Sequence, residues 1–133
     1  MAKLTEDMKK MISEQLNFLS TADENGFPQV GPKGSMRVFD DTHLIYNEET
    51  AKQALHNLQD NGRAAVAVVD RPNLKGFRFE GTAHLFDSGE IFDNAVAFGT
   101  ERHLPETHYA VVIDIERIYK LDAGPTAGDM IAD

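Results

Sequence analysis

Hydrophobic residues near the amino terminus recur every three or four positions, which is the spacing of one helical face. This apolar face consists of Leu4, Met8, Met11, Ile12, Leu16 and Leu19. Thr5 can cap such a helix, and the acidic residues Glu6 and Asp7 suit the positive end of its dipole. The pattern predicts a first helix that gives way to a strand near residues 17–18.

The next part of the chain predicts short strands. Asn25 and Gly26 tolerate the positive backbone angles of a tight hairpin turn. The run 31–35 contains two glycines and a proline, which break regular pairing within a strand. Apolar and polar positions alternate most clearly over residues 77–85 and 109–115, as in strands with one buried face.

Two further helices are expected over residues 50–60 and 88–99, separated by strands. Residues 64–69 are all apolar, which predicts a strand buried on both faces. The tail at 123–128 is rich in small residues and is expected to be flexible. The predicted order is one helix, three strands, a helix, two strands, a helix and a strand. This order differs from the regular alternation of strand and helix in a doubly wound parallel sheet. The order favours a closed or nearly closed β-barrel with helices outside.

The composition narrows the classes of function. The chain has 133 residues, which suits one domain over residues 1–133. It has no cysteine, which excludes disulfides, thiolate nucleophiles and cysteine-based zinc sites, and we expect no metal. Thirteen basic and twenty-two acidic residues give a net charge of −9, which argues against nucleic acid and anionic membranes as partners. Without an apolar leader, the chain is expected in the cytoplasm.

The start of the second predicted helix carries the most informative chemistry. Thr50 and Gln53 have the spacing of a capping box, which would aim free backbone amides at an anion. Lys52 opposes the helix dipole unless a phosphate binds there. The alternative is a solvated Lys52 that pairs with Glu48 or Glu49.

The run 31–35 gives a second indication of a ligand. Glycine has no Cβ, so a planar ring can lie against the backbone there. Lys33 and Ser35 add donors that suit a phosphate or a ribityl chain. The alternative is a plain β-bulge at a barrel corner.

Several segments, taken in order, resemble the pyridoxamine 5′-phosphate oxidase-like family of FMN-binding split barrels. They are residues 26–41, Thr50, Lys52, Asn57-Leu58, 61–63, 65–69 and 76–83. The resemblance covers residues 16–128 and implies a six-stranded antiparallel split β-barrel of Greek-key type with flanking helices. It also implies a homodimer with FMN at the two-fold interface. Polar residues of one strand face are expected to pair across that axis: Arg78, Glu80, Thr82 and His84.

The resemblance assigns the cofactor contacts as well. The first group would lie along the isoalloxazine and ribityl of FMN, and consists of Pro32, Lys33, Gly34 and Ser35. The second would hold or adjoin the phosphate, and consists of Glu49, Thr50, Ala51, Lys52 and Gln53. Residues of the partner chain near Tyr109 or the Gly124-Pro125 tail would close the site.

The chain departs from the vitamin B6 oxidases of this family. Ala51 replaces the first residue of their basic pair, and their arginine-rich C-terminal motif is missing. Pyridoxamine phosphate is therefore not the expected substrate, and the acidic charge argues against a deazaflavin. We predict an FMN-dependent oxidoreductase that moves a hydride or electrons from a nicotinamide or other donor to a small acceptor. An FMN-binding electron carrier or flavin reservoir and a haem-binding member of the fold are the alternatives, and no catalytic side chain is assigned.

Overall fold

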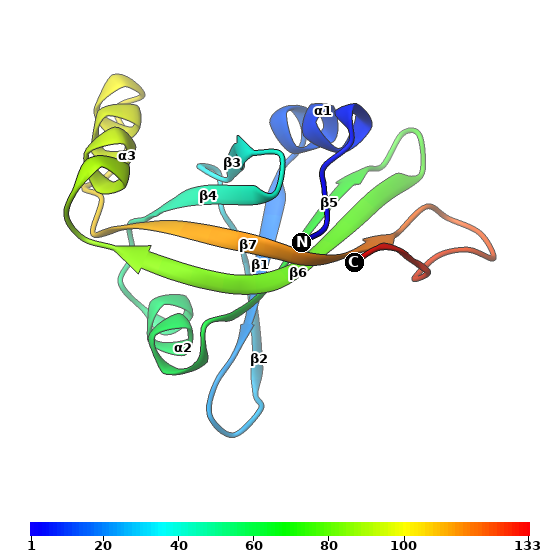
Figure 1. Ribbon diagram of the computed structural model, residues 1–133, viewed down its shortest axis with the longest axis horizontal. Coiled ribbons are helices and arrows are strands. Elements are labelled where there is room, and N and C mark those ends of the chain that lie inside the picture. Colours follow the sequence, from blue (N-terminus) through cyan, green and yellow to red (C-terminus); the bar gives the residue numbers. More distant parts are fainter.

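The computed structural model describes all residues, Met1–Asp133, and centres on one antiparallel sheet with three helices beside it (Figure 1). The helices are α1 (Glu6–Glu14), α2 (Gln53–Asn61) and α3 (Glu90–Glu101). The strands are β1 (Asn17–Ala22), β2 (Pro28–Pro32), β3 (Arg37–Asp40), β4 (His43–Glu48), β5 (Arg63–Asp70), β6 (Lys75–Phe86), β7 (Tyr109–Lys120) and β8 (Met130–Ala132). The mainly β, antiparallel class predicted from the sequence is confirmed.

The first helix begins where the sequence predicts. The Met8 amide donates to the Thr5 hydroxyl at 3.3 Å, so Thr5 is the N-cap. Met8, Met11 and Ile12 are buried beneath the helix. The helix ends at Glu14, and Leu19 reaches the same core from strand β1.

The sheet has eight strands, so the expected count of six is wrong. Its hydrogen-bonded order is β2-β1-β5-β6-β7-β4-β3, with β8 on β7. The residues expected as one interrupted strand divide into β2 and β3, which lie at the two ends of this order, because the glycines and proline of 31–35 stop the pairing. The hydrogen-bonded sheet is therefore open. Residues 123–128, expected as a flexible tail, form bends and turns, and the chain after them returns as β8, which pairs with Ile118 and Tyr119 of β7.

One face of the sheet packs against α1 and forms the main core. On β5 this face carries Ala64, Val66 and Val68, which are buried. The opposite face, called here the second face, carries Ala65 and Ala67, which are half-buried, and Val69, which is 47% exposed. The prediction of a strand buried on both faces is therefore wrong within a single chain. At one end of the second face, Ala95 of α3 packs in a small cluster with Ile45, Ala110 and Val112 of the sheet.

The second helix is fixed by its C-cap and by a side-chain hydrogen bond to β1. Gly62 follows it in the left-handed conformation (φ 69°) as the C-cap. The buried Asn57 amide donates to the Thr21 hydroxyl at 2.9 Å and ties α2 to β1. None of the three helices is long and apolar enough to cross a membrane.

Candidate functional site

The two segments that the sequence singled out both contact Glu48 at the end of β4, but the cavity that Lys33 lines contains no residue of 50–53. The Ser35 hydroxyl accepts from the Asn47 amide at 2.9 Å, which holds the β2–β3 connection against β4. Lys33, on the same connection, places its Nζ 3.8 Å from Oε1 of Glu48. The run 32–35 therefore lies beside the end of β4, from which the chain passes to α2.

Glu48 is the centre of this region, and the sequence prediction gave it no role beyond a possible partner of Lys52. Its side chain is fully buried. The backbone amides of Thr50 and Ala51 each donate to Oε2 at 3.0 Å, and the Tyr46 hydroxyl donates to Oε1 at 3.4 Å. Burial, followed by the charge of Glu48, raises the pKa of Tyr46, which keeps the phenol protonated as a donor. A buried carboxylate is tolerated here because several donors surround it.

This arrangement corrects the predicted capping box. The N-cap of α2 is Lys52, and its side chain makes no capping hydrogen bond. The Thr50 hydroxyl lies 3.4 Å from Glu48 Oε2, and the Gln53 side-chain amide donates to Asn57 Oδ1 at 2.7 Å. Because Glu48 takes the donors of Thr50 and the Ala51 amide, the helix starts three residues later than expected. Ala51 lies between Thr50 and the start of the helix and has a φ of 54°, a left-handed backbone conformation that alanine seldom adopts.

The start of α2 still presents donors for an anion. The first helical hydrogen bond runs from the His56 amide to the Lys52 carbonyl at 3.1 Å. The amides of residues 53–55 come before it and have no helical acceptor. Lys52 is exposed and forms no ion pair, so the alternative in which it pairs with Glu48 or Glu49 is not realised. The Lys52 ammonium and the three neighbouring amides together could bind a phosphate at the start of α2.

Glu49 has an unusual environment for a carboxyl group. Its Oε2 atom is buried and has no hydrogen-bond partner. Burial raises the pKa of Glu49; the charge of Lys33 partly opposes this shift, and that of Glu48 adds to it. The protonated, neutral form is therefore favoured more than in a solvated glutamate.

The nine predicted cofactor residues do not all line one cavity. Lys33 and Gly34 line a cavity of about 310 Å³ between α1, β3 and α3. Gln53 lines a different depression with Asp23 and Asp60. At Gly34 a Cβ would meet no atom within 4 Å, so the backbone there faces open space.

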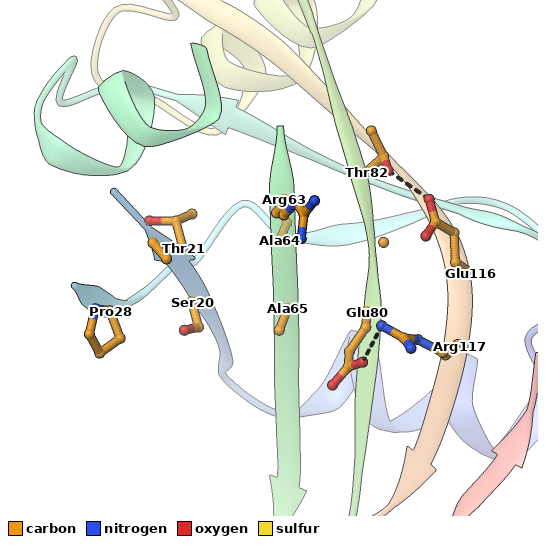
Figure 2. Close-up of a pocket in the computed structure, with 12 residues that line it drawn as sticks. Ser20, Thr21, Pro28, Arg63, Ala64, Ala65, Glu80, Thr82, Glu116 and Arg117 are labelled. Atoms are coloured by element: carbon orange, nitrogen blue, oxygen red, sulfur yellow. Dashed lines mark hydrogen bonds and ion pairs between the residues drawn. The ribbon is translucent and has the colours of Figure 1, made fainter. Parts of the chain in front are cut away.

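A third depression, of about 510 Å³, lies on the second face across β2, β1, β5, β6 and β7 (Figure 2). Arg117 pairs with Glu80 at 3.3 Å, and the Thr82 hydroxyl donates to Glu116 at 2.6 Å (Figure 2). Arg63 also lines this hollow. The hollow is polar, and its lining residues come from five strands of the sheet, because Pro28 of β2 also lines it.

The fold and these residues can be compared with known proteins. The family model for pyridoxamine 5′-phosphate oxidase matches residues 4–122, which is most of the chain. The chain belongs to this family. The resemblance seen in the sequence is thereby confirmed, and the open antiparallel sheet with three helices is the family's fold as this member builds it.

Three relatives with 29–40% sequence identity cover 88–98% of the chain. HupZ of Group A Streptococcus is 40% identical, covers 94% of this chain and 99% of its own, and superposes with a TM-score of 0.86. A Lactobacillus delbrueckii protein, provisionally described as a pyridoxamine 5′-phosphate oxidase, is 33% identical over 88% of this chain and 93% of its own, with a TM-score of 0.77. An uncharacterized protein of Methanocaldococcus jannaschii is 29% identical over 98% of this chain and 89% of its own.

More distant structures share the fold while differing in ligand. An FMN-binding protein of Syntrophomonas wolfei is 19% identical with a TM-score of 0.75. An F420 reductase is 17% identical and the haem storage protein HutZ of Vibrio cholerae is 16% identical, each with a TM-score of 0.67. Likeness at this level of identity shows the fold and does not assign a ligand.

Proposed function

We propose that this protein is an FMN-binding flavoprotein that acts as an oxidoreductase between a nicotinamide or other donor and a small acceptor. The observation that carries the proposal is the start of α2. There an unpaired Lys52 and three amides without helical acceptors lie on the chain directly after the Lys33–Glu48 contact. No other helix of the chain combines a basic residue at its N-cap with amides left free in this way.

The phosphate of FMN would bind at Lys52 and the amides of residues 53–55. Its negative charge would reverse the unfavourable interaction between Lys52 and the helix dipole. The amides of Thr50 and Ala51 would not take part, because Glu48 already accepts from both. The raised pKa of Glu49 supports the assignment, since a carboxyl group that holds its proton more readily repels a nearby phosphate less.

The ring and ribityl chain would lie along the connection from Pro32 to Ser35. Gly34 supports this placement because its missing Cβ leaves the backbone open to a flat ligand. Lys33 would add a donor, with its ammonium position fixed by Glu48. When bound, FMN supplies the hydride and electron chemistry, and the protein orients it and limits its access to water.

The same proposal includes a homodimer that buries the second face. The polar residues expected to pair across the two-fold axis already have partners within the chain, such as Arg78 with Glu80 at 2.7 Å and His84 with Asp114 at 2.8 Å. The support comes instead from apolar residues on this face. Phe18 is 37% exposed, Val30 66% and Val69 47%. A second copy that covers them would add hydrophobic stabilisation.

The absorption spectrum of the freshly purified protein tests the ligand class. We expect the absorption bands of an oxidised flavin, and we expect denaturation to release FMN. A protein that is colourless, gains no flavin spectrum on addition of FMN and instead takes up haem would contradict the proposal. Bleaching of the bound flavin by NADPH, with recovery on addition of a quinone, would separate the enzyme from a passive carrier or reservoir.

A further inference from the structure

The cavity between α1, β3 and α3 has an unusual distribution of charge. Its volume is about 310 Å³, and its wall carries three cationic side chains and no carboxylate. The cations are Arg37, Arg102 and Lys33, of which Lys33 already pairs with Glu48. The chain as a whole has a net charge of −9, so this concentration of positive charge runs against its composition.

Arg37 is the least compensated of these cations. Its Nη1 donates to the Ser35 carbonyl at 2.8 Å and to Asn47 Oδ1 at 3.3 Å, and it pairs with no carboxylate. Its Nη2 is buried and has no hydrogen-bond partner. Burial, followed by the charge of Arg102, lowers the pKa of Arg37 to about 10.

A second arginine contacts the same aromatic ring, that of Phe98. The guanidinium carbon of Arg37 lies 3.5 Å from the centre of the Phe98 ring, and that of Arg102 lies 3.8 Å from the same centre. The ring stabilises each cation, and this partly offsets the repulsion between them. The only carboxylate near Arg102 is that of Glu101 at 3.6 Å, which is 79% exposed and therefore contributes little.

The wall also holds an unsatisfied acceptor. Asn17 is 2% exposed, and its side-chain amide donates to the carbonyls of Ile12 at 3.0 Å and Gln15 at 3.2 Å. Its Oδ1 is buried and has no partner. Buried polar atoms without partners are rare because each costs free energy. One water could satisfy such atoms, but it would not offset the positive charge.

We propose that this cavity binds a small oxyanion that also carries a hydroxyl donor, the chemistry shared by hydrogen phosphate, phosphate monoesters and 2-hydroxycarboxylates. Arg37 and Arg102 would pair with the oxyanion, and Asn17 would accept from the hydroxyl. The site is distinct from the phosphate position proposed at Lys52 and does not depend on FMN. Because Lys33 and Gly34 belong to both regions, an occupant would lie next to the proposed flavin.

Calorimetric titration of the full chain with phosphate, sulfate and glycolate, at neutral pH in a phosphate-free buffer, tests the site. Phosphate or glycolate should bind saturably. The tighter of the two shows whether the cavity prefers a phosphate or a 2-hydroxycarboxylate. Arg102→Gln should weaken that binding about tenfold or more, as expected for a charge-assisted bond. Arg71→Gln is the control, because Arg71 is exposed and lines neither this cavity nor the hollow on the second face. Thermal unfolding confirms that both variants fold.

Three results would overturn the proposal. The first is no saturable binding of phosphate or glycolate up to about 10 mM, a range that covers weak specific sites. The second is equal affinity in Arg102→Gln and the parent chain, or sulfate, which lacks the hydroxyl, binding as tightly as phosphate. The third is loss of phosphate binding in Lys52→Ala but not in Arg102→Gln. This third result would place the anion at α2 and so leave the flavin proposal standing.

Discussion

The Lys33 ammonium lies 3.8 Å from Oε1 of the fully buried Glu48, and this pair joins the β2–β3 connection to the end of β4. The Lys33 side chain is only 16% exposed, so water screens the pair weakly. Both segments predicted to contact the cofactor therefore depend on one buried contact between opposite charges.

Replacing Lys33 by methionine should destabilise the fold. The change would leave Glu48 buried without its cation, and breaking buried pairs in this way costs about 3–5 kcal/mol. The amide donors from Thr50 and Ala51 reduce the expected loss to about 2–3 kcal/mol. Urea unfolding measures the loss, with the exposed Lys75→Met as the control. Equal stability of the two variants would show that the pair contributes nothing.

The burial of Glu49 should make the free energy of unfolding depend on pH. Because burial raises its pKa in the folded chain, the folded state holds the proton more tightly than the unfolded state. Stability should therefore be lost as the pH rises from about 4.3, the ordinary glutamate value, through the folded pKa. Glu49→Gln should be more stable than the parent at neutral pH and equal to it at about pH 4. Urea midpoints at both pH values measure this, and a variant less stable at neutral pH would refute the assignment.

Substitution of Gly81 should cause the strongest steric clash in the sheet. It lies where the register between β6 and β7 shifts, and a Cβ there would overlap the backbone carbonyl of Asp114. Gly81→Ala should destabilise the chain by about 3 kcal/mol or more. Gly34→Ala, where a Cβ meets nothing within 4 Å, should change stability by only a few tenths of a kcal/mol. Thermal unfolding of the two variants decides the point, and similar losses in both would be inconsistent with this packing.

The proposed homodimer is tested on its buried face. Ala65 lies on the second face, beside Glu80 in the pairing of β5 with β6. Ala65→Asp should separate the dimer, because it would bury a charge next to a like charge. Sedimentation should give twice 14.8 kDa for the parent chain and 14.8 kDa for the variant. A parent chain that sediments as a monomer would exclude the dimer.

Local signals in the sequence predicted most of the fold. Thr5 marks the start of α1, and Gly62 marks the end of α2, because capping and positive backbone angles depend on near neighbours. The division into β2 and β3 depends on pairing partners far along the chain, which local patterns do not reveal. The same holds for β8, whose only support is its pairing with β7.

The candidate site was predictable only in part. The sequence marked Lys52, and the structure leaves its side chain exposed at the N-cap of α2. Sequence spacing assigned the cap to Thr50, but the cap position depends on Glu48, a carboxylate buried by tertiary contacts. Charged residues are rarely buried without partners, so nothing in the sequence alone distinguishes Glu48 from Glu49. The pairing of Arg37 and Arg102 across Phe98 likewise joins β3 to α3 and has no local signal.

The central claim is that Lys52 and the start of α2 hold the phosphate of a flavin. Fluorescence titration of the parent chain, Lys52→Ala and the control Lys10→Ala with FMN and with riboflavin tests it directly, because riboflavin lacks only the phosphate. Lys52→Ala should weaken FMN about ten- to a hundredfold, as a charge-assisted bond contributes about 1.5–3 kcal/mol, and should leave riboflavin unchanged. FMN affinity that is equal in Lys52→Ala and the parent chain would contradict the claim.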